Sequence, residues 1–476
     1  MIRKRHLYLF IFILIIITIL ELLQLSKITS YFPSTDLSSH IANIYFINNY
    51  GFHEIIPNWY NGYISFLVYP PGLFFLSIPF YKIINNPQIV LYILLILNLL
   101  IGFIGVYFLG KILKLDYTKR LFLFLFFYFN PISITSFYKI GRLPEMLGWS
   151  FSFLYIYLIY MYKDKEINKK FLLIIPIMAT TVLAHPSIFI LSSLFLLGLF
   201  LIKSNKERGF IIFSLIISLL LTSFWLVPAF NEKITYEIYK PFLNISLPTE
   251  RILSFLTTII FGVLVFYNLR KNKKEILFYS PIILLSLLYV TRLAGYLPIL
   301  VNMHPRSIAL ILILASLIIF LTSNYENESV KKSLIVILQI MPIIFLIIFF
   351  YKNVDDYPLH NSQHQEVINL LEQVEDKFII TGKSNVDIRT KDTYSYAAVK
   401  YNLSTPFGWD LIEGSYRNSK KNLTEAFNKE DCNKIINMIN ELGGKEIISG
   451  YESCDILKRC GFKEKNITNN FCLYKK

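Results

Sequence analysis

The stretch QIVLYILLILNLLIGFIGVYFLGKI, at residues 88–112, contains a single charged residue, Lys111. An α-helix of about 20 apolar residues is long enough to cross the hydrocarbon core of a bilayer, which is about 30 Å thick. Similar apolar runs recur along the chain. They lack the alternation of apolar and polar residues that is typical of transmembrane β-barrel strands. These runs predict an α-helical membrane protein that crosses the bilayer many times.

The composition of the whole chain supports this fold class. Of the 476 residues, 54% are hydrophobic and only 17% are charged, whereas a soluble domain usually has about 25% charged residues. The formal net charge is +15 at pH 7. In a membrane protein, Lys and Arg report first on the orientation of the loops, so we expect membrane lipid and not nucleic acid as the partner of this basic chain.

Eleven apolar segments are counted as predicted spans, and Lys and Arg gather in every second loop between them. Because cytoplasmic loops carry the excess of Lys and Arg, we expect a multi-pass protein of the plasma membrane. Its basic N-terminus, residues 1–6, is expected in the cytoplasm and its C-terminus outside. The predicted spans are 7–27, 88–112, 119–138, 145–162, 170–185, 186–202, 209–228, 251–268, 275–291, 305–322 and 333–351, and the basic loops are 111–120, 163–170, 203–208, 270–274 and 331–332.

One further apolar segment, residues 70–84, is short. Counting it as a span would move every later loop to the side that its charges disfavour, so we predict a re-entrant or interfacial helix within a long first outer loop, residues 28–87. A cleaved signal peptide is the alternative for residues 1–27, but no small-residue cleavage pattern follows them.

The C-terminal part of the chain has the composition of a soluble domain. We therefore divide the chain into a transmembrane domain, 1–354, and an extracytoplasmic domain, 355–476. All four cysteines lie in the second part, which predicts two disulfides in an oxidising exterior with the pairing left open. Three glycosylation sequons, at Asn402, Asn422 and Asn466, are consistent with this location. Periodicity predicts a small α/β domain with helices at 362–375 and 430–442 and strands at 377–381 and 446–448.

Ionisable side chains gather on the predicted outer side. Asp36 and His40 are four residues apart and so share one face of a helix, where a carboxylate and an imidazole can carry out proton chemistry. Ionisable groups at the membrane edge are a functional hypothesis, although each of them could simply be solvated in an outer loop. As a set they favour an outer polar cavity. The other candidates are Glu54, Arg142, Glu145, His185, Arg292, His304 and Arg306.

Five short motifs, in this order, resemble the GT-C superfamily of membrane glycosyltransferases over about residues 25–310. More narrowly, they resemble archaeal and bacterial membrane proteins called 6-pyruvoyl-tetrahydropterin synthase-related, a name that implies no pterin chemistry here. The motifs are Thr35-Asp36-Leu37-Ser38-Ser39-His40-Ile41, Tyr69-Pro70-Pro71-Gly72-Leu73, Gly141-Arg142-Leu143-Pro144-Glu145, Ala184-His185-Pro186 and Phe224-Trp225-Leu226-Val227-Pro228.

The resemblance implies an enzyme that transfers a sugar from a polyprenyl-phosphate donor to a glycan, lipid or protein acceptor outside the membrane. It implies that Asp36, the acid of the first outer loop, is the catalytic base. Asp36 has no acidic neighbour in its motif, so Glu54 is the candidate second acid and a divalent metal is left open. An arginine fork suits a phosphate. The donor-binding candidates are Arg142, Arg292 and Arg306, with His40, Glu145, His185 and His304 beside them.

Two other classes of function stay open. A transporter or flippase of lipid-linked saccharide should have internal repeats and polar groups near the bilayer midplane, whereas here the polar groups gather at one rim and no repeat is evident. An inactive scaffold with the GT-C fold would tolerate the loss of Asp36. The sugar, the acceptor and the length of the lipid are not readable from the sequence.

Overall fold

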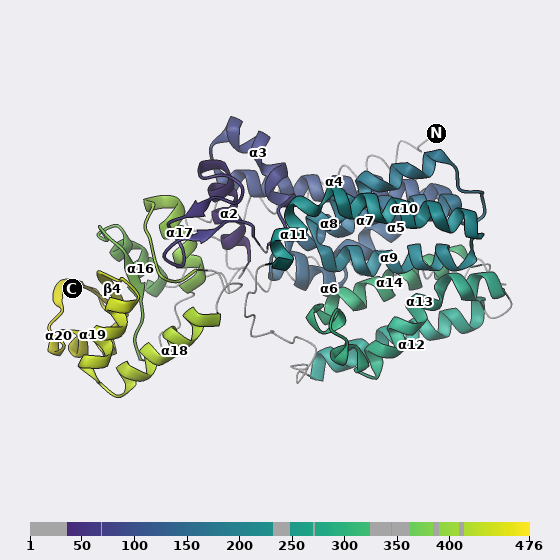
Figure 1. Cartoon of the computed structure of the whole chain (residues 1–476). Helices are drawn as coiled ribbons and strands as arrows, with labels where there is room; N and C mark the ends of the chain where they lie inside the picture. Colours follow the sequence, from purple (N-terminus) through teal and green to yellow (C-terminus); the bar gives the residue numbers. More distant parts are fainter. Residues whose placement is uncertain are drawn as a thin grey trace.

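The structure is a computed structural model that describes residues 36–67, 69–231, 248–269, 272–323, 344, 362–383, 390–408 and 414–476. The predicted spans 7–27 and 333–351 and the basic segments 1–6 and 331–332 lie outside these residues. A long helical bundle and a smaller tail form the two ends of the molecule, with the first outer loop between them (Figure 1).

The bundle is made of helices that run side by side (Figure 1). Each predicted span from 88–112 to 305–322 coincides with one of these helices or with two or three consecutive helical segments. The elements are α4 (Pro87–Ile112), α5 (Tyr117–Phe129), α6 (Pro131–Ser133), a π-helical turn (Ile134–Lys139), α7 (Leu143–Lys163), α8 (Ile174–Ala184), α9 (Pro186–Ile202), α10 (Asn205–Leu221), α11 (Ser223–Asn231), α12 (Pro248–Leu269), α13 (Lys273–Val290) and α14 (Pro305–Thr322).

Within the part of the chain that the structure describes, three helical stretches are long and apolar enough to cross a membrane: α4, Tyr117–Lys139 and α14. A fourth is added if α10 and α11, which meet at a bend of 72°, count as one span. The number of eleven spans therefore stays a prediction. The short segment 70–84 forms α3 (Gly72–Ile84), which has 13 residues. At 1.5 Å per residue α3 is about 20 Å long, which is shorter than the hydrocarbon core.

Three of the basic loops between the helices lie together at one end of the bundle. The Lys163 ammonium contacts the Glu275 carboxylate at 2.6 Å, and Lys274 contacts Asp164 at 2.7 Å. The Lys203 ammonium donates to the backbone carbonyl of Lys165 at 2.6 Å. The loops after α7, α9 and α12 therefore share one end, and the helices α7, α9 and α14 begin at the opposite end.

The first outer loop packs against both the bundle and the tail. It contains α2 (Leu37–Asn49), a short antiparallel pair of strands, β1 (Ile55–Ile56) and β2 (Tyr63–Ile64), and α3. Ile41 of α2 is buried in the core of the bundle. Phe46 of α2 and Trp59, which follows β1, form a separate apolar cluster with Ala398 of the tail.

The tail is the small α/β domain that the sequence predicts. Its sheet has the order β3-β4-β6-β5, with β3 parallel to β4 and the other pairs antiparallel. Both predicted helices and both predicted strands are present, and β5 and β6 were not predicted. The elements are α16 (Ser362–Leu371), β3 (Phe378–Ile380), α17 (Thr390–Tyr401), α18 (Gly414–Asn428), α19 (Cys432–Glu441), β4 (Glu446–Gly450), α20 (Cys454–Arg459), β5 (Lys463–Ile467) and β6 (Phe471–Lys475).

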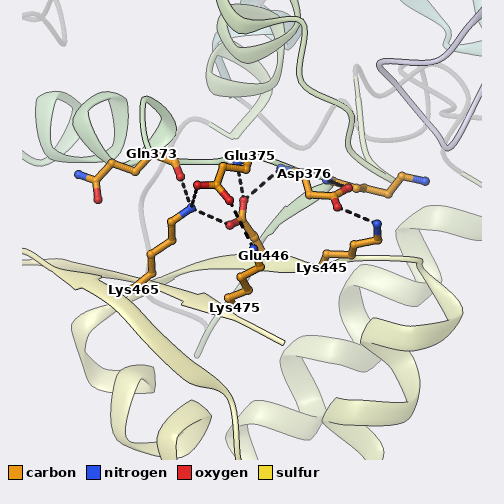
Figure 2. Close-up of polar contacts among 8 residues, drawn as sticks. Gln373, Glu375, Asp376, Lys445, Glu446, Lys465 and Lys475 are labelled. Carbon is orange, nitrogen blue, oxygen red and sulfur yellow. Dashed lines mark hydrogen bonds and ion pairs between the residues drawn. The ribbon is translucent and has the colours of Figure 1, made fainter.

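Two sets of bonds stabilise the tail. The two predicted disulfides are present, and the fold pairs Cys432 with Cys460 and Cys454 with Cys472. A network of polar contacts surrounds the buried carboxylate of Glu446 on β4 (Figure 2). One oxygen of Glu446 accepts from the backbone N–H groups of residues 375 and 376, and the other contacts the Lys465 ammonium at 3.0 Å. A buried charge is tolerated when it is paired in this way, so Glu446 ties the segment before β3 to β4 and β5.

Candidate functional site

The start of α2 is held against the loop that precedes α7. The Asp36 backbone N–H donates to the Ile140 carbonyl at 3.2 Å, and His40 Nε2 donates to the Gly141 carbonyl at 3.1 Å. The His40 N–H donates to the Asp36 carbonyl at 3.0 Å, so the two residues have the predicted helical spacing. These bonds bring Asp36 beside the residues that lead into Arg142.

His40 is fully buried in this arrangement. Burial lowers the pKa of its imidazole to about 3, and the hydrogen bond to the Gly141 carbonyl opposes the shift only in part. His40 is therefore neutral at physiological pH. Because a carbonyl can only accept, Nε2 carries the proton, and the ring serves as a neutral donor that holds α2 in place.

Arg142 and Glu145 form the first turn of α7. Gly141 has a φ of 86°, a backbone conformation that glycine adopts at little cost, and Arg142 is the N-cap residue. Arg142 Nη1 lies 3.5 Å from Glu145 Oε2. The Ser307 hydroxyl donates to Glu145 Oε1 at 2.6 Å. Glu145 is 1% exposed, so a buried carboxylate joins the start of α7 to the start of α14.

Three helices with a proline in their first turn meet here. His185 precedes α9 and Pro186, and His304 precedes α14 and Pro305. The third is α7, which has a proline in its first turn. Proline suits the first turn of a helix because a backbone N–H at that position has no acceptor within the helix, so its absence in proline loses no hydrogen bond. The first turn of a helix carries partial positive charge and unpaired N–H groups, and it favours a bound phosphate.

Tyr69 lies within electrostatic reach of these residues. Burial raises the pKa of its hydroxyl well above the usual range, the charges of Asp36 and Glu145 raise it further, and Arg142 opposes them. Tyr69 was not among the predicted site residues, although it opens one of the five motifs. Three residues on, a Cβ at Gly72 would lie 2.7 Å from the backbone of Leu183, so glycine lets the motif approach the end of α8.

The two remaining histidines of this end share the same charged neighbours. Burial lowers the pKa of His304 well below its usual value, and the positive charges of Arg142 and Arg306 add to the shift. His185 lies within electrostatic reach of Glu145 and Arg142. Its Nδ1 is buried and makes no hydrogen bond to any residue that the structure describes. We call the whole group the rim cluster: Asp36, Tyr69, Arg142, Glu145, His185, His304 and Arg306.

Two candidates from the sequence lie apart from the rim cluster. Glu54 is exposed immediately before β1, where its carbonyl accepts from the Ser65 N–H. Arg292 is exposed with a left-handed φ of 64°, before a short 3₁₀ turn. Within the described ranges, no hydrogen bond or ion pair joins either side chain to the rim cluster.

The rim cluster contains side chains that can bind metal ions, such as Asp36, Glu145 and His185. A divalent metal needs several oxygen, nitrogen or sulfur ligands converging on one point. In the described part of the chain, no three His, Cys, Asp or Glu side chains lie close enough together to hold a metal ion. The possible divalent metal therefore stays a prediction, without a site among the described residues.

Comparison with known proteins gives a structural likeness without a sequence match. No protein-family model and no curated protein matches the chain. The apo crystal structure of the Archaeoglobus fulgidus oligosaccharyltransferase is similar to it with a TM-score of 0.61 and 11% identity, covering 94% of this chain and 70% of that one. The crystal structure of the same protein in complex with Zn and sulfate is similar with a TM-score of 0.53 and 10% identity, and the match covers 88% of this chain and 64% of that one.

At such low sequence identity, these similarities concern the fold alone. The chain spans less than two thirds of the solved chain in the zinc and sulfate complex. The likeness shows that the chain shares its overall fold with this oligosaccharyltransferase. The narrower resemblance to the synthase-related family has no match among the protein families.

Proposed function

We propose that this protein is a glycosyltransferase that transfers a sugar from a polyprenyl-phosphate donor to an acceptor at the outer face of the membrane. The observation that carries the proposal is the rim cluster. It contains one partly exposed carboxylate, Asp36, whose charge acts on Tyr69 together with that of Arg142, and the first turns of three helices. This combination offers a base for a hydroxyl group and a binding site for a phosphate.

The phosphate side of the site is built from Arg142 and Arg306. The contact between Arg142 and Glu145 is long, at 3.5 Å, and the arginine side chain is 23% exposed. A guanidinium has five N–H donors, so Arg142 keeps donors for a phosphate while Glu145 orients it. The partial positive charge of the first turns of α7, α9 and α14 adds to that of the arginines.

The reaction that this geometry supports is a displacement at the anomeric carbon. Asp36 takes the proton from the acceptor hydroxyl as the new bond between oxygen and the anomeric carbon forms. The bond from the anomeric carbon to the phosphate oxygen breaks, and the electron pair leaves with the lipid phosphate. Arg142 and Arg306 stabilise the negative charge that develops there.

The distribution of charge supports an outer location for the site. The basic loops after α7, α9 and α12 lie at the end opposite to the rim cluster. By the positive-inside rule that end faces the cytoplasm. The proposed orientation therefore has the rim cluster and the tail outside the plasma membrane, where lipid-linked donors can reach them from the outer leaflet.

The test is sugar transfer from a radiolabelled polyprenyl-phosphate hexose in native membranes. Replacing Asp36 by Asn keeps the shape and removes the base, so we expect the transfer rate to fall by about 10²–10⁴-fold. Binding of polyprenyl phosphate should persist in Asp36→Asn. Arg142→Ala should instead raise the donor KM by about 10-fold or more, because it removes a charged hydrogen bond to the phosphate.

Glu54→Gln is the matched control, since it neutralises another carboxylate of the same outer loop, outside the rim cluster. We expect it to keep most of the activity, and a loss as large as that of Asp36→Asn would restore Glu54 as the second acid. Full activity of Asp36→Asn would overturn the proposed mechanism. Movement of a fluorescent lipid-linked sugar across vesicles that show no transfer would favour a transporter.

A further inference from the structure

The tail is docked on the first outer loop through an extensive interface. The Asn58 carbonyl accepts from the Thr405 N–H at 2.9 Å, and Asn58 Nδ2 donates to the Leu403 carbonyl at 3.1 Å. The Trp59 indole N–H donates to the Tyr394 carbonyl at 3.4 Å. Because these donors and acceptors are buried and paired, the tail and the loop form one packed unit.

One contact of this interface lies beside the proposed base. The Ser38 hydroxyl donates to Asp392 Oδ1 at 2.5 Å, and the two residues are 0% and 4% exposed. Ser38 is in the first turn of α2, two residues after Asp36, and Asp392 is in the first turn of α17. The helices α17 and α2 pack against each other (Figure 1).

The first turn of α2 is therefore held from two sides. On the bundle side, Asp36 and His40 bond to the carbonyls of residues 140 and 141. On the tail side, Asp392 accepts from Ser38. The carboxylate of Asp392 also lies at the start of α17, where a negative charge complements the helix dipole. A catalytic base must be held within hydrogen-bond reach of its substrate, and here the tail supplies part of the support.

From this geometry we infer that Asp392 is a positioning residue, through which the tail fixes the first turn of α2 and thereby sets Asp36 for proton transfer. The inference rests on the proposed function. It assigns to the region of the site a second carboxylate that comes from the tail, about 350 residues away along the chain, in addition to the carboxylates of the outer loop.

The kinetic test uses the full-length protein and the polyprenyl-phosphate hexose assay. We expect Asp392→Ala to lower kcat by about 10- to 100-fold, the loss that misplacement of a catalytic group by about 1 Å can cause. The donor KM should change little, because Arg142 and Arg306 lie on other elements. Asp392→Asn keeps an oxygen acceptor for Ser38 and should recover most of the lost kcat.

Ser38→Ala should also lower kcat, because it removes the same contact. The losses of the two single variants should not add up in the double variant, because both remove the contact between Ser38 and Asp392. The matched control is Asp455→Ala, which removes an exposed carboxylate from the first turn of another tail helix, α20. Wild-type kcat in Asp392→Ala, or an equal loss in Asp455→Ala, would overturn the inference.

Hydrogen exchange gives a second measurement that does not depend on activity. Amides of α2 should exchange at least about 10-fold faster in Asp392→Ala, as expected when a hydrogen bond to a charged group is lost. Amides of β4 should keep their protection, which would show that the tail is still folded. If the wild-type protein transfers no sugar, the proposed function fails while this measurement still decides the inference: unchanged exchange in α2 would overturn it.

Discussion

Replacing Glu145 by Ala tests how the rim cluster is held together. The variant removes a carboxylate that is 1% exposed, accepts from Ser307 at 2.6 Å and pairs with Arg142 at 3.5 Å. A hydrogen bond to a charged group contributes about 1.5–3 kcal/mol. The pair with Arg142 adds roughly 1 kcal/mol, because the arginine is 23% exposed and its charge is partly solvated. We therefore expect Glu145→Ala to destabilise the protein by about 2.5–4 kcal/mol.

Glu145→Gln separates the two contributions. The Gln side chain keeps the shape and an oxygen acceptor for Ser307, but it loses the charge that orients Arg142. We expect a cost of about 1–2 kcal/mol, since a charged acceptor is replaced by a neutral one. Expressed as free energies, the rise in the donor KM should exceed the loss of stability, because Arg142 is no longer held toward the phosphate.

The assay is the midpoint of unfolding of the purified full-length protein in mixed micelles, followed by the fluorescence of its tryptophans. Glu166→Ala is the control, because Glu166 is exposed in the loop after α7, at the opposite end of the bundle. A cost below about 1 kcal/mol for Glu145→Ala, comparable to that of a surface substitution, would refute the view that this buried carboxylate joins α7 to α14.

Three further predictions follow from the fold. Gly72→Ala should cost about 1–3 kcal/mol by overpacking, because the new Cβ would lie 2.7 Å from backbone atoms, whereas nothing lies within 4 Å of a Cβ at Gly262; the unfolding midpoints of the two Ala variants check this. His40 has a pKa of about 3 in the fold because it is buried, and about 6.5 in the unfolded chain. The contribution of neutral His40 to stability should therefore be complete above pH 6.5 and be lost as the pH falls toward 3. Between these pH values, His40→Asn should flatten the measured pH dependence of the free energy of unfolding. Single cysteines at Lys206 and Lys420 should react with an impermeant thiol reagent from opposite sides of the membrane, and labelling from the same side would contradict the predicted topology.

The sequence determined those features of the protein that depend on neighbours along the chain. Helices recur at every apolar run from 88–112 to 305–322, because burial of a long apolar segment and its backbone hydrogen bonds are local requirements. The prolines at residues 144, 186 and 305 lie in the first turns of their helices for a local reason as well. Residues at one rim, such as Arg142 and His185, could be grouped from the sequence because each lies at the end of a predicted span. The charges of the loops predict which side of the membrane that end faces.

The tertiary structure decided which of these residues meet. Ser307 lies 162 residues from Glu145, and Asp392 lies 354 residues from Ser38, and no local pattern indicates either contact. The same holds for the disulfide pairing, which depends on how β4, β6 and the tail helices pack together. The edge strand β5 was missed because its residues are mostly exposed and show no alternating pattern.

The second acid shows the difference most clearly. Glu54 is the other acid of the first outer loop, yet it is exposed immediately before β1, whereas Asp392 comes from the tail to the first turn of α2. A periodic sequence pattern reports which face of a segment is buried. It carries no information about which distant segment covers that face, because that choice is made by packing and by the pairing of buried polar groups across the whole fold.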